Sequence, residues 1–133
     1  MTPRAPISWG ELVDKITILE IKVERLRSAE AVANARRELT LLLDVLTGMA
    51  DAPAGLAALR SELGVMNRRL WDIEDEIRAK EALQSFDARF IELARAVYRT
   101  NDERSRIKRE INALLRSDIV EEKQYTPYRD SDD

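Results

Sequence analysis

The stretch LAALRSELGVMNRRLWDIEDEI (residues 56–77) decides the fold class of this chain. Seven of its apolar residues recur at alternating spacings of three and four: Leu56, Leu59, Leu63, Met66, Leu70, Ile73 and Ile77. A helical turn takes 3.6 residues, so this spacing places all seven side chains in one stripe along a single helix. A helix with such a stripe packs against other helices, which predicts an antiparallel bundle.

Three further apolar stripes follow the same rule on either side of this stretch. They begin at Leu12, Val32 and Phe86 and run to Leu26, Met49 and Leu114. Turn signals separate them, namely Gly48, Pro53 and Gly55 in one gap and QSFD (84–87) in another. We therefore predict an all-α bundle of about four helices, roughly 8–27, 29–49, 55–83 and 86–116, with a partly ordered C-terminal tail.

The helix boundaries rest on capping residues. Ser8 and Glu11 fit a capping box at the start of the first helix. Neither Gly nor Pro separates the first two stripes, so one long helix and a hairpin that turns near Ser28 both stay open. We favour the hairpin, with Ser28 as the cap of the second helix. Ser85 is the expected cap of the fourth helix, and Gly64 indicates close approach of a neighbour.

Composition limits the chemistry available to the chain. Its 133 residues are 44% apolar and 35% charged, with no cysteine and no histidine. This removes disulfides, thiolate ligands and the commonest catalytic base, so an enzyme is disfavoured and we expect no cofactor or metal. No apolar run is long enough to cross a bilayer and no signal core is present, so we expect a cytoplasmic protein. We predict one helical domain (1–125) and a disordered acidic end (126–133).

Charge argues against nucleic acid as a partner. The net charge is −3, and residues 117–133 alone carry −4. The helical body is therefore close to neutral, which is a poor match for a phosphate backbone.

Polar residues interrupt the fourth stripe at Thr100 and Arg104. A buried Arg needs a carboxylate partner, and we expect Arg104 to pair with Glu74 or Glu81 rather than with the other acids near the stripes. Two interpretations stay open: a device that fixes helix register, or the polar floor of a ligand pocket. The candidate residues of this cluster are Asp14, Glu20, Glu74, Glu81, Asn101, Arg104, Lys108 and Asn112.

Several large apolar residues lie away from the stripes. Either neighbouring helices of the same chain cover them, or they form an interface with a protein partner or a second copy. The candidate interface residues are Ile18, Ile21, Trp71, Ile91 and Tyr98.

Four motifs carry a resemblance to a known family. ITILEIK (16–22), LWDIEDEIR (70–78), NDER (101–104) and EEK (121–123) occur in this order over nearly the whole chain. In this respect the chain resembles an uncharacterised family of short bacterial helical proteins, a domain of unknown function. The resemblance implies no established activity, and it implies an association with glycosyl-transfer and surface-polysaccharide proteins. Because it extends through EEK, we expect residues 119–125 to dock on the bundle.

Three classes of function remain in view. A non-catalytic interaction or accessory module, working through a protein partner or homodimer, is favoured by the off-stripe apolar residues and the missing catalytic chemistry. The alternative is a small all-α enzyme, or an anion- or nucleotide-binding protein, with a polar pocket around Arg104. Nucleic-acid binding is disfavoured by charge.

Overall fold

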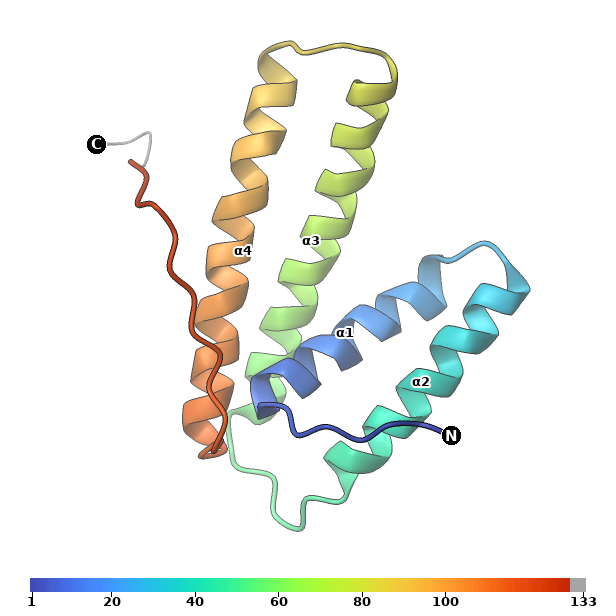
Figure 1. The fold of residues 1–133 in the computed structure, drawn as a ribbon, viewed down its shortest axis with the longest axis vertical. Helices are drawn as coiled ribbons and strands as arrows, with labels where there is room; N and C mark the ends of the chain where they lie inside the picture. Colours follow the sequence, from blue (N-terminus) through green and yellow to red (C-terminus); the bar gives the residue numbers. More distant parts are fainter. Residues whose placement is uncertain (130–133) are drawn as a thin grey trace.

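A computed structural model describes residues 1–129 of the chain and confirms the all-α prediction. Its four helices are α1 (Trp9–Arg25), α2 (Ala29–Thr47), α3 (Leu56–Ala82) and α4 (Ala88–Leu114) (Figure 1). Each boundary lies within three residues of the predicted one. The apolar spacing therefore located every helix.

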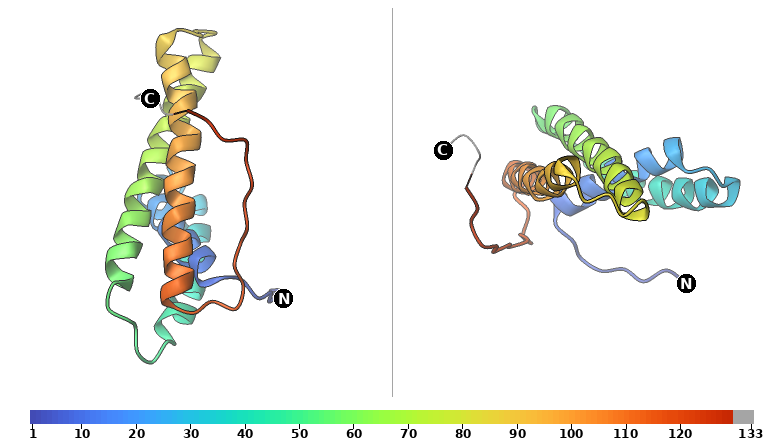
Figure 2. Two further views of the ribbon diagram at one scale, coloured as in Figure 1. Left: turned by 90° about the vertical axis from the view of Figure 1, so that its left-hand side faces the viewer. Right: turned by 90° about the horizontal axis from the view of Figure 1, so that it is seen from above.

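The helices form two hairpins that cross. α3 and α4 run antiparallel as one long pair, and α1 lies across the lower part of that pair (Figures 1 and 2). α1 packs against all three other helices, whereas α2, among the helices described, packs closely only on α1. The upper part of the α3–α4 hairpin consequently projects beyond α1 and α2.

Local sequence explains where α1 and α2 begin. The Ser8 hydroxyl accepts a hydrogen bond from the Glu11 backbone N–H at 3.1 Å, as the capping box predicts. The Ser28 hydroxyl accepts from the Ala31 N–H at 3.3 Å and caps α2. The hairpin is therefore confirmed, and the alternative of one long helix is wrong.

The start of α4 corrects the prediction. Asp87, not Ser85, is the N-cap, because its carboxylate accepts from the Phe90 N–H at 3.0 Å. Phe86 thus precedes the helix. The helix then continues through TNDE to Leu114 as predicted, since the apolar stripe persists on both sides of Thr100.

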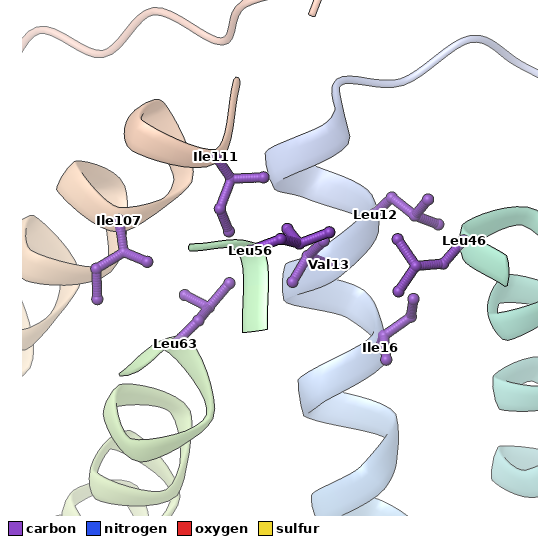
Figure 3. Close-up of a cluster of buried hydrophobic side chains, with 8 residues drawn as sticks. All are labelled: Leu12, Val13, Ile16, Leu46, Leu56, Leu63, Ile107 and Ile111. Atoms are coloured by element: carbon purple, nitrogen blue, oxygen red, sulfur yellow. The ribbon is translucent and has the colours of Figure 1, made fainter. Parts of the chain in front are cut away.

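The main core lies where α1 meets the other three helices. Its buried side chains come from all four helices (Figure 3): Leu12, Val13, Ile16, Leu46, Leu56, Leu63, Ile107 and Ile111. Higher in the α3–α4 hairpin, Ile73 and Leu93 are buried. The core therefore fixes α1, and with it the polar side chains that α1 carries into the interior.

The segment after α4 turns back and runs beside that helix (Figure 2). The Glu121 carboxylate accepts from Lys108 Nζ at 3.2 Å, and the Tyr128 hydroxyl donates to Asp102 at 2.6 Å. The segment has no helix or strand up to Arg129. The predicted disordered end (126–133) stays a prediction: it begins at Thr126 among described residues, and residues 130–133 lie outside them.

Candidate functional site

A carboxylate, Asp14, lies buried at the centre of the polar cluster between α1, α3 and α4. Its side chain is 1% exposed. Two nitrogens of Arg104 donate hydrogen bonds to this carboxylate, Nε to Oδ1 at 2.9 Å and Nη2 to Oδ2. Asn67 Nδ2 donates to the same Oδ1 at 2.9 Å. A bidentate contact between an arginine and a carboxylate is a strong ion pair with a defined geometry.

The expected pairing of Arg104 with Glu74 or Glu81 is therefore wrong. Glu74 pairs with Arg78, one turn along α3, at 3.1 Å. Glu81 is exposed near the end of α3 that projects beyond α1. α1 crosses the hairpin at the level of Arg104 and brings Asp14 to it. Sequence spacing within one helix could not show that crossing.

Asn67 was missed by the sequence prediction, although it holds the cluster together. It is 5% exposed, and its amide also donates to Thr17 Oγ1 at 2.8 Å. Thr17 in turn donates to the Asp14 backbone oxygen at 2.8 Å. The sequence did indicate that Asn67 faces the interior, because it lies four residues after Leu63 and three before Leu70, the spacing of the α3 stripe.

Lys108 extends the cluster toward the C-terminal segment. Its side chain is 9% exposed, and its ammonium lies 2.8 Å from Glu11, 3.7 Å from Asp14 and 3.2 Å from Glu121. The three donors of a lysine ammonium suit three carboxylates arranged in this way. Two cations, Arg104 and Lys108, thus meet three acids, so the cluster has no surplus positive charge.

The first backbone N–H groups of α1 are also occupied. Trp9 N donates to Ser117 Oγ at 3.3 Å and Gly10 N to Asn112 Oδ1 at 2.6 Å. α1 approaches α4 so closely that a Cβ at Gly10 would lie 2.5 Å from the Lys108 backbone oxygen. The end of α1 is therefore docked on α4, and these donors do not offer an anion site.

The electrostatics keep both central groups charged. Burial alone would raise the pKa of Asp14, but the hydrogen bonds and charge of Arg104, with Asn67 and Lys108, outweigh it and lower that pKa. Burial likewise opposes the charge of Lys108, yet its contacts with Glu11, Asp14 and Glu121 raise the pKa. Both groups are thus ionised at neutral pH.

The structure brings some candidate residues together and leaves others apart. Asn101 joins the cluster, with its side-chain oxygen 3.4 Å from Arg104 Nη1. Glu20 instead pairs with Arg60 at 3.1 Å. Residues united in or beside the cluster are Asp14, Asn101, Arg104, Lys108 and Asn112, whereas Glu20, Glu74 and Glu81 lie outside it.

The candidate interface residues divide in a similar way. Ile21 is 1% exposed and lies in the interior, so the prediction that it belongs to an interface is wrong. Ile18 and Trp71 are half-buried and line an open groove together with Glu74 and Arg104. Ile91 is exposed; Tyr98 is partly covered by Tyr128, with ring centroids 4.9 Å apart.

The charged groups of the cluster are occupied by one another and leave little space beside them. The small cavity beside Lys108, of about 10 Å³, has room for a single water molecule at most. Within residues 1–129 no three acidic side chains are grouped to hold a metal ion. None of the helices from Trp9 to Leu114 is long and apolar enough to cross a membrane.

Comparison with known proteins places the chain in a family. Neither a curated protein nor a solved structure matches it. The model of a family of unknown function (DUF6165) matches residues 4–131, almost the whole sequence, and this confirms the predicted resemblance to an uncharacterised family. The chain therefore belongs to this family of unknown function, DUF6165.

Proposed function

We propose that this protein is a non-catalytic interaction module that associates with a second copy of itself through the hairpin end. The hairpin end consists of the turn between α3 and α4 and the adjoining helix ends, with Leu83, Phe86 and Ile91. The observation that carries the proposal is their exposure: these three apolar residues are 78%, 53% and 58% exposed. Such residues gathered where one helix pair projects alone are typical of an interface.

The charges around the hairpin end favour a second copy over a charged partner. Lys80 pairs with Asp87 at 2.7 Å, and Arg89 binds Glu76 with two nitrogens at 2.8 and 2.7 Å. Arg89 also pairs with Glu92 at 3.3 Å, and residues 76–92 carry three basic and four acidic side chains, a net charge of −1. In a two-fold contact each surface meets its own copy, so this near-neutrality keeps the repulsion between like charges small.

The exposed area sets the strength of the association. The three exposed fractions correspond to roughly 400 Å² of apolar surface per chain, taking about 200 Å² for a fully exposed large side chain. A standard specific interface buries about 800 Å² per partner. We therefore expect a dimer that forms reversibly and depends on concentration.

Cross-linking locates the contact, and the chain is well suited to it because it has no cysteine. Ala82→Cys puts a thiol at the hairpin end, and Ala33→Cys puts one at a position on α2 that is also exposed. With a flexible bismaleimide we expect a covalent dimer from Ala82→Cys and little from Ala33→Cys. Equal yields from the two variants would contradict a contact at the hairpin end.

The biological setting of the proposal rests on the resemblance alone. It suggests an accessory protein of glycosyl-transfer or surface-polysaccharide pathways, and the cytoplasmic location stays an expectation from the sequence. The alternative, a ligand pocket around Arg104, is tested by thermal shift against nucleotides, nucleotide sugars and dicarboxylates. A ligand present at about 100 times its dissociation constant would stabilise the fold by ~2.7 kcal/mol. We expect no such shift, because Asp14 already neutralises Arg104.

A further inference from the structure

An irregular segment, residues 118–129, runs beside the side of α4 that carries Lys108, Asp102 and Tyr98 (Figure 2). Going along this segment, Glu121 contacts Lys108, and then Tyr128 contacts Asp102 and Tyr98, nearer the start of α4. The segment thus follows α4 in the opposite direction. Two of its residues, seven positions apart in the segment, contact the helix: Glu121 through its carboxylate and Tyr128 through its ring and hydroxyl.

The segment buries little apolar surface in doing so. Ile119, Val120 and Tyr125 stay 41%, 48% and 72% exposed. The contacts of Glu121 and Tyr128 with α4 described above, namely an ion pair, a hydrogen bond and a ring contact, lie at or near the surface. Such contacts contribute little individually. The segment can therefore leave α4 without disturbing the hydrophobic core.

The surface beneath is built independently of the segment. Two α1 carboxylates, Glu11 and Asp14, hold the Lys108 ammonium in place, and its remaining donor faces Glu121. Ser105, Arg109 and Asn112 line the small cavity beside it. A fixed cation at one point and the Tyr98 ring at another remain on α4 when the segment is removed.

We propose that this face of α4 is a binding site for an acidic, tyrosine-containing peptide segment of another protein chain, and that residues 118–129 occupy it as an intramolecular ligand. The partner's carboxylate takes the place of Glu121 on Lys108, and its aromatic ring takes the place of Tyr128 on Tyr98. The site is separate from the hairpin end. The chain's own segment is covalently joined to α4, so its effective concentration at the site is high. A segment of another chain therefore binds weakly until the contacts of Glu121 and Tyr128 with α4 are weakened.

The test uses the full chain and a fluorescein-labelled peptide of residues 117–129, SDIVEEKQYTPYR. Fluorescence anisotropy gives its affinity for the wild type and for Glu121→Gln/Tyr128→Ala, in which the intramolecular contact is weakened. The matched control is Glu122→Gln/Tyr125→Ala, which changes the same residue types at exposed positions. We expect at least tenfold tighter binding to Glu121→Gln/Tyr128→Ala than to the wild type or the control.

A change in the peptide checks the contact without touching the fold. A peptide with glutamine in place of the glutamate equivalent to Glu121 loses the ion pair to Lys108, so we expect binding about two- to fivefold weaker. Equal binding of the two peptides would overturn the proposal, and so would equal affinity of the three proteins. Either result would mean that the segment merely lies against α4.

Discussion

Asp14 and Arg104 lie 90 residues apart in the sequence and form a bidentate ion pair that joins α1 to the α3–α4 hairpin. The carboxylate is 1% exposed and the guanidinium 24%. The pair lies at the crossing of the two hairpins, where α1 contacts every other helix. We therefore expect this pair to fix how α1 crosses the hairpin, because apolar stripes alone leave that crossing less well determined.

Arg104→Met leaves Asp14 buried without its cation, and we expect a loss of about 3–5 kcal/mol in the free energy of unfolding. Asp14→Asn/Arg104→Met removes both charges, so its cost should be smaller than the sum of the two single costs by about 0.5–3 kcal/mol. Urea unfolding of the four proteins measures this cycle. Unchanged stability of Arg104→Met would show that the pair does not hold the fold and would revive the pocket interpretation.

Lowering the pH should remove the contribution of Asp14 to the free energy of unfolding. Its pKa is lower in the folded than in the unfolded chain, so its stabilisation is fully present above about pH 4 and is lost as pH falls through the folded pKa. The difference in unfolding free energy between the wild type and Asp14→Asn should therefore shrink as pH falls from about 6 to 3. Other carboxylates titrate in both proteins and cancel. A difference that stays constant over this range would contradict the assignment.

Gly10→Ala should destabilise the protein by about 1–3 kcal/mol, the cost of overpacking a close contact. The added Cβ would meet the Lys108 backbone oxygen at 2.5 Å and Asn112 Oδ1 at 2.9 Å. Gly64→Ala is the matched control, because no atom lies within 4 Å of its Cβ. In mid-helix that change should stabilise by about 0.5–1 kcal/mol. Thermal unfolding compares the two, and a stabilised Gly10→Ala would contradict the close approach of α1 to α4.

These two glycines show what the sequence could and could not predict. Gly64 was expected to mark a close approach and does not, whereas Gly10 marks one and was passed over. Both lie in helices, and their roles depend on which helix passes nearby. Helix positions follow from the spacing of apolar residues within each helix, so all four were predicted. The angle at which α1 crosses α3 and α4 is not contained in that spacing.

The polar cluster could likewise be predicted only in part, because its pairing depends on how the hairpins cross. Arg104 was recognised because it interrupts an apolar stripe, and a buried cation requires an acid. Asp14 was among the candidates, but its selection over Glu74 and Glu81 depends on the crossing of the hairpins. Ile21 lay off its stripe and was therefore expected at an interface; it is buried because α1 is covered on more than one side.

The measurement that tests the central claim most directly is sedimentation velocity over a range of concentrations. We expect the wild type to shift from monomer toward dimer between about 10 and 500 µM, the range suited to a small interface. Phe86→Ser/Ile91→Ser should stay monomeric throughout. Leu41→Ser/Val45→Ser removes apolar residues that are equally exposed on α2, at 54% and 55%, and should dimerise like the wild type. A wild type that remains monomeric at the highest concentration, or equal loss of dimer in both variants, would contradict association through the hairpin end.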